Sequence, residues 1–140
     1  MPDLDNCQFS NGTHHYDFSG LYNTTQYSRA SGRNTYYFNI CAPSQLCQMK
    51  AGNSDSVVCQ QSGSTFYNLG LSKTGQWSAL SNGKEGAQVH YSDGAPCSRA
   101  IRNTVIQLEC GTGPTTILSV SEVEACSYEI TMSSSLACPQ

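Results

Sequence analysis

Residues 102–110 read Arg-Asn-Thr-Val-Ile-Gln-Leu-Glu-Cys, and apolar and polar side chains alternate along them. Alternation with a period of two is typical of a β-strand with one buried face. The inner face of this predicted strand holds Thr104, Ile106, Leu108 and Cys110. Counting backwards adds Arg102 to the same face, so we expect a guanidinium group at the end of an apolar stripe.

Three more polar side chains fall on predicted inner faces. In the predicted strand Cys126–Met132, Tyr128 shares a face with the apolar residues. Glu122 follows Leu118 and Val120 in phase, and Gln60 follows Val58. Each could instead lean into solvent from a strand end, and Tyr128 could be an ordinary core tyrosine. Buried without partners, such groups cost several kcal/mol, so a ligand with many hydroxyl groups would suit them.

The rest of the chain indicates an all-β fold. Aromatic and β-branched residues gather in short segments, and no helical period is visible. Besides the two strands above, these segments are Thr35–Cys41, Ser56–Gln60, Thr65–Leu69, Ala87–Tyr91 and Thr116–Ser121. Asn82-Gly83 and Asp93-Gly94 are typical hairpin turns.

Length and charge limit the possible functions. A chain of 140 residues with a net charge of −3 suits one domain and lacks the basic stripe that nucleic acids require. It carries no catalytic motif, so we expect no enzyme, no cofactor and no metal site. No apolar run could span a bilayer, and residues 1–5 do not resemble a signal peptide. We expect a single module, 1–140, cut from a longer protein, with Met1-Pro2 added ahead of it.

The eight cysteines indicate an oxidising compartment. Their spacing is longer than that of most zinc sites, so we expect disulfides, although spacing alone leaves 105 pairings open. Asn11-Gly12-Thr13 and Asn23-Thr24-Thr25 are glycosylation sequons, and they predict glycans on Asn11 and Asn23. We therefore expect the lumen of the secretory pathway (Golgi, endosome, lysosome or endoplasmic reticulum) or the extracellular side of a receptor.

Seven segments together resemble one known family. They are Tyr36–Cys41, Val58–Gln60, Tyr67–Gly70, Tyr91–Cys97, Arg102–Cys110, Glu122–Tyr128 and Ser135–Cys138. Their order and spacing are similar to those of the mannose 6-phosphate receptor homology domains, above all to a single repeat of the cation-independent receptor. This family occurs in sorting receptors for lysosomal enzymes and in lumenal proteins that bind glycans.

The resemblance implies a fold and a disulfide pairing. The fold is a flattened β-barrel of two crossed antiparallel sheets with a sugar pocket at one end. The four implied disulfides are Cys7–Cys41, Cys47–Cys59, Cys97–Cys126 and Cys110–Cys138.

The resemblance also implies a binding site for mannose. In the members that bind mannose, a Gln, an Arg, a Glu and a Tyr hold the ring, and the matching positions are Gln60, Arg102, Glu122 and Tyr128. Glu124 is an alternative to Glu122, and Gln61 and Gln48 are alternatives to Gln60.

The implied partners are glycans on glycoproteins, with lysosomal hydrolases foremost. Phosphomannose is favoured over plain mannose, and Ser98 and Arg99 are then the phosphate contacts. The parent protein would be membrane-anchored and multidomain, and it would sort lysosomal enzymes. The alternatives are a plain-mannose reader in endoplasmic reticulum quality control, an accessory subunit of a glycan-processing enzyme, and a protein-binding or spacer repeat without a sugar site.

Overall fold

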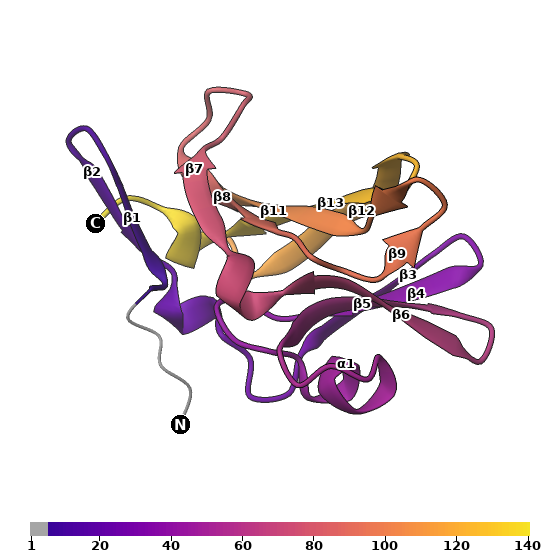
Figure 1. The fold of residues 1–140 in the computed structure, drawn as a ribbon. Helices are drawn as coiled ribbons and strands as arrows, with labels where there is room; N and C mark the ends of the chain where they lie inside the picture. The colour runs from indigo at the N-terminus through magenta and orange to yellow at the C-terminus, as the bar shows by residue number, and fades with distance from the viewer. Residues whose placement is uncertain (1–5) are drawn as a thin grey trace.

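The computed structural model describes residues 6–140, and Figure 1 shows them as two packed layers of strands. Met1-Pro2, expected to be additions, lie outside the described residues. In chain order the strands are β1 Gln8–Asn11, β2 His14–Asp17, β3 Tyr27–Ser31, β4 Asn34–Phe38, β5 Ser56–Ser62, β6 Thr65–Leu71, β7 Gln76–Ala79, β8 Gly86–Tyr91, β9 Pro96–Cys97, β10 Ala100–Ile101, β11 Asn103–Cys110, β12 Thr116–Glu124 and β13 Ser127–Ser134. The helix α1 (Gln45–Lys50) and the 3-10 turns η1 (Ser19–Leu21), η2 (Ser72–Thr74) and η3 (Ser135–Ala137) complete the chain. Within residues 6–140, no helix is long and apolar enough to cross a membrane.

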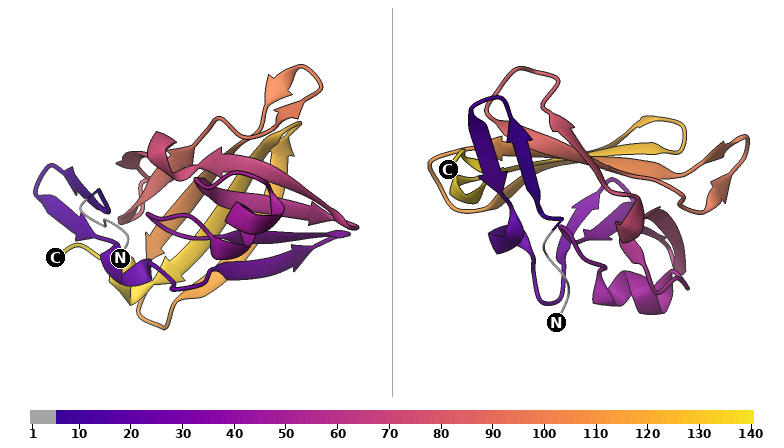
Figure 2. Two further views of the ribbon diagram at one scale, coloured as in Figure 1. Left: turned by 60° about the horizontal axis from the view of Figure 1, so that its bottom comes forward. Right: turned by 60° about the vertical axis from the view of Figure 1, so that its left-hand side comes forward.

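Two sheets form the body of the domain (Figure 2). One has four antiparallel strands in the order β3-β4-β5-β6, and the other has five in the order β12-β13-β11-β8-β7. Two hairpins, β1-β2 and β9-β10, project from this body. The all-β class and the packing of two sheets agree with the prediction.

One pair of neighbours, β11 and β13, is parallel. After β11 the chain skips one strand position and forms β12 at the edge of the sheet. The β12–β13 hairpin then brings β13 into the position between β12 and β11. The five-stranded sheet is therefore antiparallel except at this one ladder, a detail that the sequence pattern does not contain.

The core lies between the two sheets and follows the predicted alternation. Thr104, Ile106 and Leu108 of β11 are buried, as are Tyr128 and Ile130 of β13. The prediction was wrong for Leu118, which is 47% exposed. A register shift between Ile117 and Ser119 changes the phase of β12, so that Ile117 packs against the core instead.

Hydrogen bonds at both open edges close the two sheets into a flattened barrel. On one side, Arg29 and Ser31 of β3 donate to the carbonyl oxygens of Ile117 and Val120 in β12. On the other side, β6 bonds to the segment that follows β8, where the Leu71 N–H donates to the Ser92 carbonyl oxygen at 2.9 Å.

The predicted hairpin at Asp93-Gly94 is absent from the structure. After β8 the chain runs along the edge of β6 instead, where the Ala95 N–H donates to the Asn68 carbonyl oxygen at 2.7 Å. The Asn82-Gly83 turn does lie between the paired strands β7 and β8.

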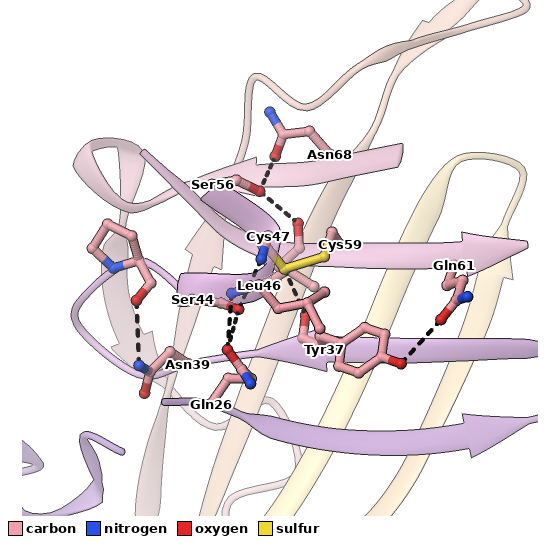
Figure 3. Close-up of a disulfide and its surroundings, with 12 residues drawn as sticks. Gln26, Tyr37, Asn39, Ser44, Leu46, Cys47, Ser56, Cys59, Gln61 and Asn68 are labelled. Carbon is pink, nitrogen blue, oxygen red and sulfur yellow. Dashed lines mark hydrogen bonds between the residues drawn. A yellow bond between two sulfur atoms is a disulfide. The ribbon is translucent and has the colours of Figure 1, made fainter. Parts of the chain in front are cut away.

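Four disulfides join the parts of the chain: Cys7–Cys41, Cys47–Cys59, Cys97–Cys126 and Cys110–Cys138. They are the same four pairs that the resemblance implies. Figure 3 shows Cys47–Cys59, which fixes α1 against β5. Ser44 caps this helix by accepting a hydrogen bond from the Cys47 N–H at 3.2 Å.

Candidate functional site

The four predicted sugar contacts come from four different strand ends. Gln60 lies in β5, Arg102 directly precedes β11, Glu122 lies near the end of β12, and Tyr128 lies at the start of β13. In the five-stranded sheet, Tyr128 stands opposite Glu122 and beside Thr104, two residues after Arg102. The strand register therefore brings three of the four residues to the same end of this sheet.

The fourth residue, Gln60, reaches this group from the other sheet. The Tyr128 hydroxyl donates a long hydrogen bond of 3.5 Å to Gln60 Oε1. Gln60 Nε2 in turn donates to the Tyr36 hydroxyl at 3.1 Å. Gln60 is 6% exposed, Tyr128 3% and Tyr36 4%, so these three side chains form the buried floor of the site.

Arg102 is fixed by its backbone and by its side chain. Its carbonyl oxygen accepts a hydrogen bond from the Gly94 N–H at 2.9 Å, and its own N–H donates to the Ala95 carbonyl oxygen at 3.1 Å. The guanidinium carbon lies 4.3 Å from the centre of the Tyr67 ring, which is a cation–π contact, and Nη1 donates to the Pro96 carbonyl oxygen at 2.7 Å. Nε is buried and finds no hydrogen-bond partner among residues 6–140. A buried, unpartnered N–H is costly, so this group suits an additional acceptor.

Glu122 is exposed, and one of its carboxylate oxygens, Oε2, accepts a hydrogen bond from the Cys126 N–H at 2.7 Å. Burial raises the pKa of the Tyr128 phenol, a hydrogen bond from Arg102 lowers this pKa, and the negative charge of Glu122 raises it again. Tyr128 therefore keeps its proton at neutral pH and acts as a donor. Both charged groups lie close enough to influence its hydroxyl.

The alternative residues lie away from this group. Glu124 stands opposite Ser127, whose side chain points to the other face of the sheet. Gln61 accepts a hydrogen bond from the Tyr37 hydroxyl at 3.0 Å, also on the opposite face. Gln48 belongs to α1 and donates to the Ser54 carbonyl oxygen.

Ser98 and Arg99, the expected phosphate contacts, are exposed at the turn of the β9–β10 hairpin. The base of this hairpin is held by the hydrogen bond from Arg102 to Pro96 and by the Cys97–Cys126 disulfide. The hairpin thus borders Arg102, while its tip makes no hydrogen bond to the four predicted contacts.

Both sequons lie outside the core. Asn11 is exposed at the end of β1. Asn23 Oδ1 accepts hydrogen bonds from the N–H and the hydroxyl of Thr25 at 2.9 and 3.0 Å.

A cavity of about 450 Å³ lies apart from the four predicted contacts. Its lining includes Asp55, Lys73, Trp77 and Tyr91, and none of the four predicted contacts borders it. The sequence does not predict this cavity, because its walls come from segments far apart along the chain.

Two aromatic residues of the site were also missed in the sequence. Tyr36 and Tyr67 flank Gln60 on the neighbouring strands, as the register of β4, β5 and β6 shows. Tyr36 shares its inward phase with Phe38, so the signal was present, but its partner depended on the pairing of β4 with β5.

Comparisons with known proteins agree with this architecture. The family described as glucosidase II beta subunit-like protein matches residues 17–140. None of the curated proteins compared with the chain matches it significantly.

Solved structures show the same fold. Domain 11 of the echidna receptor for mannose 6-phosphate and IGF2 superposes with a TM-score of 0.72 at 24% identity, over 100% of this chain and 99% of that one. The mannose-bound MRH domain of glucosidase II beta has a TM-score of 0.54 at 24% identity, over 85% of this chain and 97% of that one. The MRH domain of Yos9, complexed with alpha3,alpha6-Man5, has a TM-score of 0.59 at 19% identity, over 88% of this chain and 85% of that one.

Proposed function

This chain belongs to the family of mannose 6-phosphate receptor homology domains, a lectin-like and non-catalytic domain type, and we propose that it binds a terminal mannose of N-glycans. The proposed contacts are Gln60, Arg102, Glu122 and Tyr128. The observation that carries the proposal is the convergence of an amide, a guanidinium, a carboxylate and a phenol from four strands.

These chemical groups suit the hydroxyl pattern of mannose. Its axial 2-hydroxyl meets Gln60 and Arg102, its 3-hydroxyl meets Arg102 and Glu122, and its 4-hydroxyl meets Glu122 and Tyr128. A carboxylate accepts from two neighbouring hydroxyls, and arginine offers a rigid fork of donors. The buried Nε of Arg102, which has no partner in residues 6–140, supplies one donor that a sugar oxygen would satisfy.

The same groups give selectivity against other hexoses. A misplaced hydroxyl leaves a buried partner unmet, which costs about 1–3 kcal/mol. A single domain with few contacts binds one sugar modestly. Useful avidity then comes from several domains or several sugars at a high effective concentration.

A finer proposal concerns the 6-phosphate of phosphomannose. Ser98 and Arg99, at the turn of the β9–β10 hairpin whose base borders Arg102, would offer a hydroxyl and a guanidinium as phosphate donors. The domain then serves the sorting of lysosomal hydrolases in the secretory pathway. Because the second phosphate pKa is about 6, binding should weaken as the pH falls from 7 to 5. Equal affinity at both values would count against the phosphate contact.

A second candidate function is the reading of plain mannose in the endoplasmic reticulum. Two observations favour it: the family match to glucosidase II beta subunit-like proteins, and the fold shared with an MRH domain of glucosidase II beta that was solved with mannose bound. In that case the domain supports a glycan-processing enzyme or quality control, and Ser98 and Arg99 stay outside the contact.

A glycan array at neutral pH tests the proposal and separates its two forms. It compares phosphomannosyl, phosphodiester and plain high-mannose glycans for the wild type and for Arg102→Ala. Gln60→Ala and Gln61→Ala form a matched pair, since the second glutamine lies on the opposite face. We expect mannose-dependent binding that Arg102→Ala and Gln60→Ala abolish and Gln61→Ala retains. If folded wild type binds no mannose-bearing glycan, the lectin proposal fails.

A further inference from the structure

The Tyr36 phenol contacts the proposed site although it is not one of the four proposed contacts. Its hydroxyl lies 3.1 Å from Gln60 Nε2, and the two residues stand directly opposite each other in β4 and β5. Its ring also lies 6.0 Å from that of Tyr128, centre to centre. Tyr36 therefore touches one proposed contact and packs near another.

The Gln60 amide has two ends with opposite chemistry. Nε2 only donates hydrogen bonds, and Oε1 only accepts them. The last torsion of a glutamine side chain is broad and roughly two-fold, so Gln60 itself does not determine which end faces the site. Its neighbours must determine this orientation.

Two neighbours favour the same orientation. On one side, the Tyr36 oxygen accepts from Nε2. On the other side, Oε1 accepts from the Tyr128 hydroxyl, which lies within the reach of the Arg102 guanidinium. The amide is thus held with Nε2 toward Tyr36 and Oε1 toward Tyr128.

We propose that Tyr36 is a positioning residue that holds the Gln60 carbonyl toward Tyr128 in the sugar site, and that it thereby contributes to selectivity for an axial 2-hydroxyl. The second part of this inference rests on the proposed function. A hydroxyl between Gln60 Oε1 and Arg102 donates to the first and accepts from the second, so both of its hydrogen-bonding capacities are used. Without the Tyr36 hydroxyl, a buried N–H of Gln60 loses its partner and the side chain moves to find another.

The chain offers a matched control on the same two strands. The Tyr37 hydroxyl donates to Gln61 Oε1 at 3.0 Å, on the face opposite to Tyr36 and Gln60. Tyr36→Phe and Tyr37→Phe each remove one hydroxyl that is bonded to a glutamine. Only the first removes it from the proposed site.

The first test needs no sugar. Nuclear magnetic resonance of the Gln60 side-chain NH2 group reports its hydrogen bonding in the free protein. We expect slowed exchange with solvent and contacts to the Tyr36 ring in wild type and in Tyr37→Phe, and the loss of both in Tyr36→Phe. Unchanged Gln60 NH2 signals in a folded Tyr36→Phe variant would overturn the positioning role.

The second test compares two sugars, methyl α-mannoside and its 2-deoxy analogue, by calorimetric titration. Tyr36→Phe should weaken mannoside binding roughly 5- to 150-fold and leave the 2-deoxy sugar nearly unaffected, whereas Tyr37→Phe should change neither. Equal weakening for both sugars would indicate a merely structural role and overturn the selectivity claim. If wild type binds neither sugar, the proposed function and the selectivity claim both fail, and the resonance test alone decides whether Tyr36 holds Gln60.

Discussion

Tyr91→Phe should remove a specific loss of stability at alkaline pH. Tyr91 is 2% exposed, and its hydroxyl accepts a hydrogen bond from the Cys41 N–H at 3.1 Å. Its pKa is raised from 10.0 to about 12, mainly by burial; the hydrogen bond from Cys41 opposes this rise in pKa, and the charge of Asp55 adds to it. The folded protein therefore holds the phenol proton more tightly than the unfolded chain does.

The sign and the size of the effect follow from linkage. The contribution of Tyr91 is complete below pH 10, and it is lost as the pH rises toward 12, because the unfolded chain ionises first. For these two pKa values, the free energy of unfolding falls by about 1 kcal/mol between pH 9 and pH 11.

Urea unfolding of wild type and Tyr91→Phe at pH 9 and pH 11 measures this difference. The variant should be less stable at pH 9, because the Cys41 N–H loses its acceptor. Between the two pH values, however, it should lose about 1 kcal/mol less than wild type. None of the cysteines in residues 6–140 is free to start disulfide exchange, which favours a reversible transition. Equal losses in the two proteins would refute the reasoning.

Three further substitutions test the fold and the site. Gly70→Ala places a Cβ 2.7 Å from a side-chain carbon of β8, so it should lower the free energy of unfolding in urea by about 1–3 kcal/mol. Gly113→Ala has open space around its Cβ and should not lower it. Equal stability of the two variants would argue against the close packing of β6 on β8. Thr104→Val leaves a buried β6 carbonyl oxygen without its donor and should lower the free energy of unfolding by about 1–3 kcal/mol in the same assay. A variant as stable as wild type would show that this hydrogen bond contributes nothing to stability. Glu122→Gln keeps an acceptor for the backbone N–H that Glu122 bonds, so the melting temperature should stay unchanged. Calorimetry should show mannose binding that is roughly tenfold weaker. A similar loss of binding in Glu124→Gln would contradict the assignment of Glu122 as the contact.

Long strands with one buried face could be predicted from the sequence. β11 and β13 show the alternation clearly, and their inner residues Ile106 and Ile130 are fully buried. Short and polar strands could not be predicted in this way. β3 (Tyr-Ser-Arg-Ala-Ser) and β7 (Gln-Trp-Ser-Ala) bury few side chains, so their pairing depends on the neighbouring strand.

Local irregularities were also beyond the sequence pattern. The register shift in β12 exposes Leu118, although simple alternation places this residue inside. The helix α1 is only six residues long, and it depends on the Ser44 cap and on the Cys47–Cys59 disulfide rather than on an apolar period.

The proposed site was partly readable from the sequence. Strand phase puts all four residues, Gln60, Arg102, Glu122 and Tyr128, on inner faces near strand ends, and the resemblance to the family connects them into one site. That Gln60 lies in the opposite sheet and contacts Tyr128 depends on how the two sheets pack. The same packing explains why Tyr36 was overlooked.

The central claim, that one end of the barrel holds a terminal mannose, is tested most directly by a ¹H–¹⁵N titration with methyl α-mannoside. We predict saturable shift changes in the backbone signals of Gln60, Arg102, Glu122 and Tyr128 and in the side-chain signals of Gln60 and Arg102, and we predict that Arg102→Ala abolishes them. The claim would be contradicted if the folded wild type showed no saturable change, or if the changes gathered instead around the cavity lined by Trp77.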